Sequence, residues 1–372
     1  SRKDLALLRE LELVEPRKIE ILPGGQGVEL TRFDPNSALT PSRADAREQL
    51  GLPPSWRHVI GVAGLIEAPA EIAAIAGALA QRIASALDRP VRDEVAAFAR
   101  RLGEDAGALA VLFYGSNLRT GSLEGVLDFY VLLPGPQRER IWPRVSYREW
   151  DHSGIRLRAK IATLSLAQFA QAAGGTSRDT TIWARFVQPS TLAWHADETA
   201  RSAVLDALGL AARTAARLAA AVGPDSGSAD DYWRALFRAT YEAEFRVEKP
   251  GRENAILEVN AAHFDGLLPL AWQADGIGYA RDGTTLCPSL APDERNRVLR
   301  WWRRRARLGK PLNLLRLAKA TTTFDGAADY AAWKLHRHTG ITLEVTPFRS
   351  RYPLLAAPGA LFELWRKRRD QR

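Results

Sequence analysis

The chain has 372 residues, of which 26% are charged and 46% apolar, a balance typical of soluble globular proteins with room for two or three domains. A single cysteine, Cys287, excludes an internal disulfide and a cysteine-rich zinc site, and no apolar run reaches the roughly eighteen residues of a membrane-spanning helix. The 52 Lys and Arg residues exceed the 43 Asp and Glu residues, which favours partners that carry phosphate: nucleic acid, nucleotides or an anionic membrane surface. The charged opening, SRKDLALLRELELVEPRK, lacks the apolar core of a secretory signal, and we expect a cytoplasmic protein.

Residues 1–64 form one compositional unit, which opens with a short strand, Ile19–Leu22, and a glycine-rich turn. The helix-forming run AREQLGL follows, and then HVIGVAG, a second short strand that runs into glycine. The unit resembles the opening of the C-terminal domain of the family-4 glycosyltransferases, but two strands are too few to close such a sheet, and the acidic signature of that family does not follow. We therefore expect a glycosyltransferase-like fragment.

The next region, 65–198, begins with helical periodicity and continues into strands. Apolar residues are spaced three and four apart from Ala68 to Leu102, and Arg89-Pro90 divides this run into two helices. Three strand-like segments follow, at Ala108–Tyr114, Val126–Leu133 and Ile155–Leu164. The pattern predicts helices that lead into a short mixed sheet.

The region 199–290 is predicted to be a helical domain, for which a winged-helix-like arrangement is one possibility. Thr199–Val222 is rich in alanine and leucine and ends at a Gly-Pro-Asp-Ser-Gly-Ser linker. Asp230–Arg246 is the next helix, and the polar turn KPGREN follows it. Together with the preceding region, this pattern predicts an α+β protein whose small mixed sheet is followed by mostly helical structure.

A Gly-Ser pair and one aspartate are the residues that suggest chemistry. Gly115 and Ser116 follow the first predicted strand, and Asp128 interrupts the second, very apolar one. Burying a carboxylate in a strand is costly unless a cation or hydrogen bonds compensate it. Asp128 therefore either faces a bound cation, or ends a strand or pairs with a nearby arginine.

The order of helix, strand, Gly-Ser turn and aspartate-bearing strand resembles the core of the polymerase-β-like nucleotidyltransferases. In that superfamily the backbone N–H groups and the serine hydroxyl of the turn bind triphosphate oxygens, and carboxylates on the adjacent strand hold Mg²⁺. The resemblance implies the same α+β core here. Val126 stands where the superfamily usually has a first carboxylate, so Glu124 would have to supply it.

Further segments resemble the mitochondrial-type phosphatidate cytidylyltransferases, the translocator assembly and maintenance family, which make CDP-diacylglycerol from CTP and phosphatidic acid. IRLRAKIATLSLAQF, IWARFVQP and LFRATYEAEFRVEKPGREN match segments of that family in chain order, over roughly residues 95–260. Glu244 departs from the family, which has aspartate there. The positions carried over from the matching segments are Arg185, Gln188, Pro189, Tyr241, Phe245 and Arg246.

The resemblance implies a reaction in which metal ions and cationic side chains align two anions that repel each other. The candidate nucleotide-binding residues are Gly115, Ser116, Asn117 and Arg119. The candidate catalytic residues are Asp128, Lys160 and Arg185, and the candidate Mg²⁺ ligands are Asp128 and Glu124. For Lys160 and Arg185, a surface or structural ion pair is the alternative. Glu149 and Asp151 are reserve ligands in a segment that is predicted to be a solvated loop.

The region 291–372 is strongly basic. Its run RNRVLRWWRRRARLGKPLNLLRLAK has ten cationic residues and no acid, and we expect a helix over Arg295–Lys319. A second helix is predicted over Ala327–His338, and a short amphipathic segment, LFELWRKRRDQR, follows. Basic amphipathic helices with tryptophan suit an anionic membrane interface, although a nucleic-acid-binding face or a solvated arginine-rich surface are alternatives. The candidate membrane-binding residues are Trp301, Arg303, Arg304, Arg305, Trp365, Arg366, Lys367 and Arg368.

These observations favour a Mg²⁺-dependent phosphatidate cytidylyltransferase that uses CTP and phosphatidic acid at the inner face of the cell membrane as a peripheral protein. No DNA- or RNA-reading module is recognisable, and no nucleic-acid partner is expected. One alternative is a nucleotidyltransferase with another acceptor, such as a small molecule or an RNA end. Another is a non-catalytic, membrane-associated protein that keeps the nucleotidyltransferase fold. A glycosyltransferase is supported only by residues 1–64.

Overall fold

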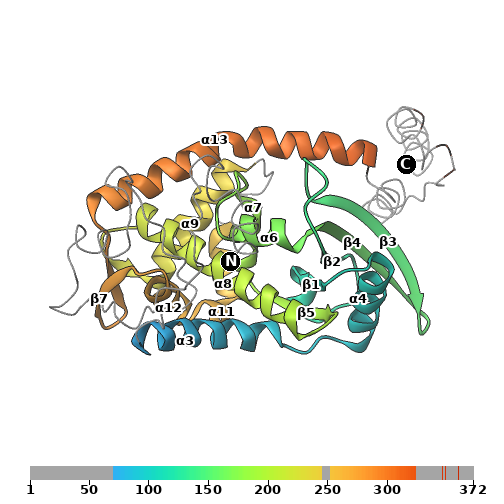
Figure 1. Ribbon diagram of the computed structural model, residues 1–372, viewed down its shortest axis with the longest axis horizontal. Coiled ribbons are helices and arrows are strands. Elements are labelled where there is room, and N and C mark those ends of the chain that lie inside the picture. The colour runs from blue at the N-terminus through green and yellow to red at the C-terminus, as the bar shows by residue number, and fades with distance from the viewer. Residues whose placement is uncertain (1–69, 245–251, 324–345, 347, 349–358, 360–372) are drawn as a thin grey trace, which may run out of the picture. The chain divides into compact units, whose positions relative to one another are not determined.

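The computed structural model describes residues 70–244, 252–323 and the single positions 346, 348 and 359 (Figure 1). The chain divides into two units, Ser1–Ala70 and Glu71–Arg372, and every described residue after Ala70 belongs to the second. The glycosyltransferase-like fragment 1–64 and the helix predicted over Ala327–His338 lie outside the described residues.

A five-stranded mixed sheet, in the order β3-β4-β2-β1-β5, is the scaffold of the Gly-Ser turn and of Asp128. Its strands are β1 (Ala110–Tyr114), β2 (Leu127–Leu133), β3 (Arg144–His152), β4 (Ile155–Ser165) and β5 (Ser190–His195). In this sheet β2 and β4 pair in parallel, and the other neighbouring strands pair antiparallel. The three predicted strands are confirmed as β1, β2 and β4, whereas β3 and β5 were not among the predictions.

The strands bury alternate residues on opposite faces of the sheet, because successive side chains of a strand point to opposite sides. One face packs against helix α4 (Asp93–Ala106), where Phe98 meets Phe129 at a centroid distance of 5.9 Å. The other face, which includes Tyr130, joins the larger core of the helical region. Asp128 lies two residues before Tyr130 and therefore belongs to this second face.

The helical region is built around one long helix, α8 (Glu198–Val222), whose buried side chains are mostly alanine. Small side chains let neighbouring helices approach closely, and five helices pack against α8. These are α6 (Leu166–Ala173), α7 (Thr181–Phe186), α9 (Ala229–Ala243), α12 (Leu267–Ala274) and α13 (Pro292–Thr323). The helices predicted at Thr199–Val222, Asp230–Arg246 and Arg295–Lys319 are confirmed as α8, α9 and α13.

Short elements complete the helical region. Helices α10 (Arg252–Val259) and α11 (Ala261–Phe264) connect α9 to α12. A small antiparallel sheet joins β6 (Gly227–Ser228), which precedes α9, to β7 (Gly278–Asp282) and β8 (Thr285–Ser289), which follow α12. Trp272 of α12 is fully buried, and its indole Nε1–H donates to the Ala216 carbonyl of α8 at 2.8 Å. The sheet region and the helical region share one continuous apolar core.

Helix α13 runs along the outside of the other helices, as the orange ribbon in Figure 1 shows. Trp301 and Trp302 turn inward from it and meet Trp183 of α7, at centroid distances of 5.9 and 6.0 Å. Helix α3 (Ala70–Leu87) packs on the opposite side of α8 from α13 in the same view. The break between α3 and α4 falls at the predicted position, Arg89-Pro90.

The predicted fold class is confirmed, because the protein is α+β with a small mixed sheet followed by mostly helical structure. The boundaries predicted at residues 198 and 290 stay predictions. Among the described helices, none combines the length and the apolar character that crossing a bilayer requires.

Candidate functional site

The Gly-Ser turn lies directly against Asp128. Strand β1 ends at Tyr114, Gly115 turns the chain with φ 91° and ψ −161°, and Ser116 begins the short helix α5 (Ser116–Thr120). These backbone angles are accessible in practice only to glycine. A Cβ atom at position 115 would lie 2.9 Å from Oδ2 of Asp128, so the turn also needs glycine for lack of space. The prediction that Asp128 lies beside the turn is confirmed.

Strand register places Asp128 in a row of polar side chains across the sheet. Successive cross-strand partners form this row, one from each strand in the order of the sheet from β5 to β3: Ser190, Tyr114, Asp128, Lys160 and Tyr147. Directly paired residues project from the same face of a sheet. The aspartate is therefore held between a tyrosine and a lysine, on the face that looks towards the helical region.

A cavity of about 370 Å³ opens above this row, between the sheet and helices α9 and α10. Such a volume lies in the range of small-molecule sites. Its polar wall consists of Tyr114, Gly115, Ser116, Arg119, Asp128, Lys160, Arg185 and Gln188. Pro189, which follows Gln188, also lines the cavity, and the opposite wall comes from the helical region: Tyr241, Ala255, Ile256, Val259 and Asn260.

The electrostatic balance of the cavity centres on Asp128. Burial raises the pKa of the Asp128 carboxyl, and the positive charges of Lys160 and Arg185 oppose that rise. Arg119, from α5, is a third cation in the wall. One carboxylate among three cations makes the cavity positive, which suits a ligand with several negative charges.

Arg185 is held over two aromatic rings. Its Nη1 donates to the hydroxyl groups of Tyr114 at 3.2 Å and Tyr130 at 3.4 Å, and its guanidinium carbon lies 5.4 and 6.0 Å from the two ring centroids. Burial would lower the pKa of Arg185, but its neighbours, chiefly Tyr130 and Tyr114, outweigh that effect and hold the pKa above its ordinary value. Arg185 is thus a fixed positive charge at the cavity wall.

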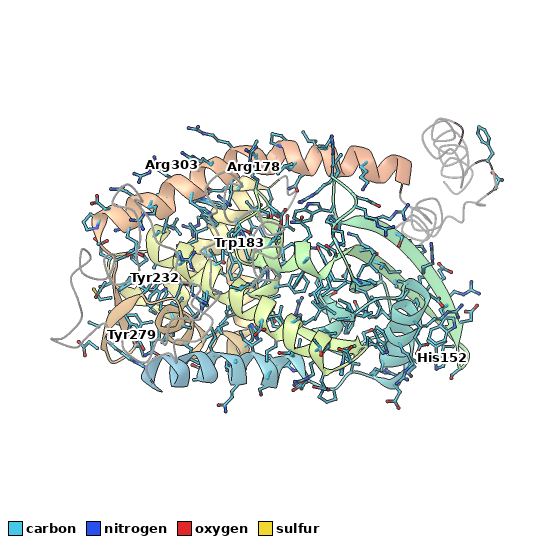
Figure 2. All side chains as sticks on the ribbon, in the orientation of Figure 1. His152, Arg178, Trp183, Tyr232, Tyr279 and Arg303 are labelled. Carbon is cyan, nitrogen blue, oxygen red and sulfur yellow. The ribbon has the colours of Figure 1, made fainter. Side chains whose placement is uncertain are left out.

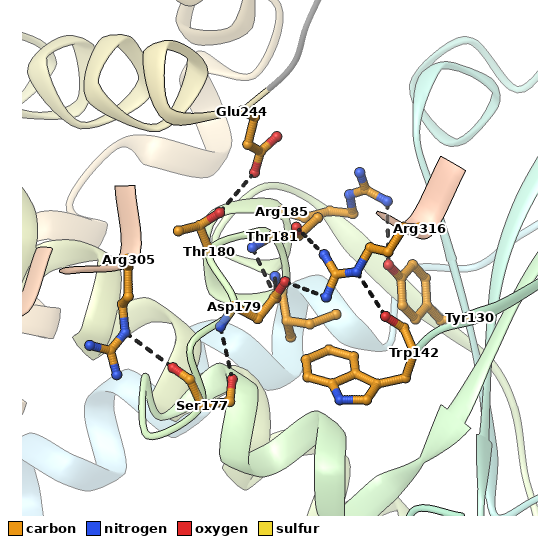
Figure 3. Close-up of polar contacts among 11 residues, drawn as sticks. Tyr130, Trp142, Ser177, Asp179, Thr180, Thr181, Arg185, Glu244, Arg305 and Arg316 are labelled. Atoms are coloured by element: carbon orange, nitrogen blue, oxygen red, sulfur yellow. Dashed lines mark hydrogen bonds and ion pairs between the residues drawn. The ribbon is translucent and has the colours of Figure 1, made fainter. Parts of the chain in front are cut away.

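Helix α7, which carries Arg185, is fastened at its first turn by buried Asp179 (Figure 3). Asp179 Oδ2 accepts from the backbone N–H groups of Thr181 and Ile182 at 2.9 and 3.0 Å, which satisfies donors that a helix start leaves free. Its Oδ1 forms an ion pair at 2.7 Å with Arg316 of α13. The position of Arg185 therefore depends on contacts from a helix far along the chain.

Six of the residues predicted for the nucleotide and for catalysis come together at the cavity: Gly115, Ser116, Arg119, Asp128, Lys160 and Arg185. Asn117 does not line it, because its side chain turns into the following loop. There the amide nitrogen donates to the Ser122 and Glu124 carbonyls at 2.9 and 2.7 Å. Glu124 lies in that loop and likewise does not line the cavity, so the structure brings neither Asn117 of α5 nor Glu124 to the cavity wall.

The reserve ligands Glu149 and Asp151 also lie away from the cavity, and the prediction of a solvated loop is wrong at this point. Both residues are on edge strand β3. Asp151 pairs with Arg156 at 2.8 Å, and Glu149 pairs with Arg158 at 3.4 Å. Strand β3 is at the edge of the sheet and has one strand neighbour, so many of its side chains are polar and exposed. That composition resembles a loop, although the backbone of β3 is paired with β4.

Metal-binding capacity rests on Asp128. Within the described part of the chain, no group of three or more His, Cys, Asp or Glu side chains could hold a metal ion by itself. Magnesium is commonly bound by one or two carboxylates together with the phosphates of a substrate. A single carboxylate beside a positive cavity fits an ion that arrives with a nucleotide.

The candidate membrane residues divide into three groups. Trp301 and Arg305 point inward: both donate to the Gly175 carbonyl, and the Arg305 guanidinium lies 4.2 Å from the Trp301 ring centroid. Both are half-buried and engaged within the protein, and their role as membrane contacts stays a prediction. Arg303 and Arg304 are exposed, and Figure 2 shows Arg303 on the outer side of α13. The last group, Trp365, Arg366, Lys367 and Arg368, lies outside the described residues.

Several cavity residues were not assigned a role from the sequence. Tyr114 was predicted only as the end of a strand. Ile256 and Val259 come from a helix that was not predicted, and Asn260 directly follows that helix. The family resemblance had marked Gln188, Pro189 and Tyr241 without a role, and all three line the cavity. Their position in matched segments was the signal that could have identified them.

No protein-family model matches the chain. No curated protein matches it either.

Proposed function

We propose that this protein is a nucleotidyltransferase that transfers CMP from CTP to the phosphate of phosphatidic acid, giving CDP-diacylglycerol and pyrophosphate. The observation that carries the proposal is the contact between the Gly115 turn and Asp128 in the floor of a cavity with three cations. A turn that exposes backbone N–H groups next to a carboxylate can receive a triphosphate and its counter-ion. The resemblance to phosphatidate cytidylyltransferases supplies the identity of the two substrates.

The reaction joins two anions, and the cavity residues offset their repulsion. A phosphate oxygen of the acceptor attacks the α-phosphorus of CTP, a new P–O bond forms, and the bond to the bridging oxygen breaks, so that pyrophosphate leaves with the bonding electrons. The attacking oxygen is already an anion, and little proton abstraction is required. Arg119, Lys160 and Arg185 provide fixed positive charge for the transferred and departing phosphates, which is the main catalytic requirement of phosphoryl chemistry.

Asp128 would hold Mg²⁺ together with the triphosphate oxygens of CTP, and the ion would supply charge neutralisation there. Lys160 lies opposite Asp128 in the parallel pair of β2 and β4. The lysine therefore keeps a positive charge beside the carboxylate. Ser116, at the start of α5, can offer its hydroxyl to a phosphate oxygen.

The acceptor is a membrane lipid in this proposal, and the protein would act as a peripheral protein at the cytoplasmic membrane face. Exposed Arg303 and Arg304 on α13 supply positive charge for anionic headgroups. The basic segment 361–372 would add to that attraction.

A second candidate is a non-catalytic protein that binds a nucleotide in the same cavity. The observation that favours it is the single carboxylate, because the related enzymes usually place two acids on this strand. Turnover separates the two candidates, since both bind CTP but one of them releases pyrophosphate.

The proposal is tested with labelled CTP, Mg²⁺ and vesicles that contain phosphatidate. The expected products are pyrophosphate and a lipid-soluble cytidine compound. Asp128→Asn should lower the rate at least about a hundredfold, because it removes the carboxylate beside the triphosphate. Asp151→Asn is the matched control, since Asp151 is on the same sheet, 64% exposed and outside the cavity. CTP binding without product would favour the non-catalytic candidate, and equal rates for both variants would remove Asp128 from the mechanism.

A further inference from the structure

A second, smaller cavity lies behind the wall that Arg185 forms. Its volume is about 170 Å³, and it is bounded by α7, α13 and the chain that leads into β3. The residues of interest in its wall are Tyr130, Thr181, Arg185, Asn313, Arg316 and Lys319. Arg185 lines both cavities, and the Tyr130 hydroxyl to which it donates belongs to a residue that lines the second.

The cationic groups of this second cavity are fixed in place from behind. Arg316 pairs with buried Asp179 at 2.7 Å, and its Nε donates to the Trp142 carbonyl at 2.8 Å (Figure 3). Its guanidinium also lies 5.0 Å from the centroid of the Trp142 ring. Lys319 donates to Glu139 and to the Ile141 carbonyl. Donors that are already oriented lose little freedom when an anion arrives.

The remaining donors suit a compact oxyanion. The contacts of Arg316 with Asp179, Trp142 and Thr181 involve its Nη2, Nε and Nη1 atoms once each, and a guanidinium has five N–H groups. The Asn313 amide adds two N–H donors to the wall. A phosphate monoester presents three oxygens and close to two negative charges at neutral pH. The wall offers positive charge and N–H donors for these oxygens from four residues: Arg185, Asn313, Arg316 and Lys319.

We propose that this second cavity binds the phosphate monoester of the acceptor, and that Arg185 is the residue shared between acceptor and nucleotide. The inference rests on the proposed function, because it gives the second substrate of that reaction its own site. Two anions that must react would thereby share one fixed cation, which offsets their repulsion.

The apolar part of the acceptor comes from the proposed function and not from this cavity. Leu314 and Leu315 are 51% and 47% exposed, but one and two residues after Asn313 they lie on other faces of α13, and neither lines the cavity. A lipid phosphate and a glycerol phosphate present the same oxyanion to the four donors, and the probes below distinguish them.

The test uses the full chain and titration calorimetry with four probes: CTP, dihexanoyl phosphatidate, dihexanoylglycerol and glycerol 3-phosphate. Asn313→Asp places a negative charge in the second cavity and retains both members of the Arg316–Asp179 pair. We expect it to weaken dihexanoyl phosphatidate at least about tenfold through charge repulsion and to leave CTP affinity within about twofold. Asn296→Asp is the matched control, because Asn296 is an exposed residue of the same helix outside both cavities.

Each outcome decides a separate point. Equal phosphatidate affinity for Asn313→Asp and Asn296→Asp overturns the inference, and so does a wild-type protein that binds CTP but no phosphate monoester. Binding of phosphatidate well above glycerol 3-phosphate, with no binding of dihexanoylglycerol, supports a lipid phosphate; equal binding of the two phosphates assigns the site to the phosphate alone. A third result separates the two proposals: phosphatidate binds, Asn313→Asp weakens that binding, and CTP does not bind. This result would support the anion site and overturn the proposed nucleotidyl transfer.

Discussion

The ion pair between Arg316 and Asp179 is expected to be one of the most important polar contacts for stability. The two side chains are 19% and 2% exposed, and Asp179 also caps the start of α7 through two backbone N–H groups. Arg316→Met would leave the aspartate buried with its charge uncompensated. Removing one partner of a buried pair costs about 3–5 kcal/mol, and because Arg316 keeps some exposure we expect about 3 kcal/mol.

Urea denaturation followed by circular dichroism measures this loss as a lower midpoint at unchanged slope. The matched control is Arg234→Met, because Arg234 pairs with Asp231 at 2.8 Å where the side chains are 34% and 46% exposed. Partly exposed pairs contribute at most about 1 kcal/mol. Adding Asp179→Asn to Arg316→Met should recover part of the loss, since it removes the uncompensated charge and keeps an oxygen for the helix cap. A loss for Arg316→Met no larger than that of Arg234→Met would refute the reasoning.

Three further predictions concern single residues. Gly115→Ala gives alanine a backbone conformation that costs about 1–3 kcal/mol, and it brings the new methyl group into contact with Asp128. Urea denaturation should show a lower free energy of unfolding, and CTP titration should show weaker binding. Asp128→Asn should stabilise the fold at pH 7, because burial raises the pKa of Asp128 and the charged form therefore costs stability. The gain in unfolding free energy should shrink as the pH falls through the raised pKa towards the ordinary value of aspartate, and it should be absent below that value. Burial lowers the pKa of His263 to about 4, so stability should fall by up to about 3 kcal/mol as the pH drops from about 6.5 to 4, and urea denaturation of His263→Asn should show a flatter pH dependence over that range.

The sequence predicted the elements whose pattern is local. Strands β1, β2 and β4 are apolar enough to be recognised, and α8 and α13 have clear helical periodicity. Strand β3 escaped because its composition is polar, although its partner β4 follows directly after Ser153 and Gly154. Strand β5 escaped because its partner β1 is distant in the sequence. In β3 the sequence RVSYREWDH alternates charged and apolar residues on an edge strand, and in β5 the pairing with β1 contains an irregularity at Val111 and Leu112.

The candidate site was predictable where it depends on one short segment. Gly115, Ser116 and Asp128 lie within fourteen residues of sequence, and the hairpin-like pairing of β1 with β2 brings Tyr114 opposite Asp128. The other wall, with Ile256 and Asn260, depends on how α10 packs against α9, which no local pattern encodes.

The basic helix shows what a local pattern leaves out, because packing within the protein engages part of the cluster that the sequence assigned to a membrane surface. The run RWWRRR suggests a membrane-facing cluster, yet Trp301 fits against Gly175 so closely that a Cβ there would lie 2.8 Å from its ring. The tryptophans of α13 therefore serve the core, and the exposed arginines Arg303 and Arg304 keep the predicted surface role as a proposal.

The central claim is that the cavity between the Gly115 turn and Asp128 receives the triphosphate of CTP. A crystal structure of the protein with Mg²⁺ and a non-hydrolysable CTP analogue tests it most directly. We predict phosphate density within hydrogen-bonding distance of the Gly115–Ser116 backbone and of Lys160 or Arg185, on the side of the turn where Asp128 lies. Nucleotide bound elsewhere on the protein, with this cavity empty, would contradict the account.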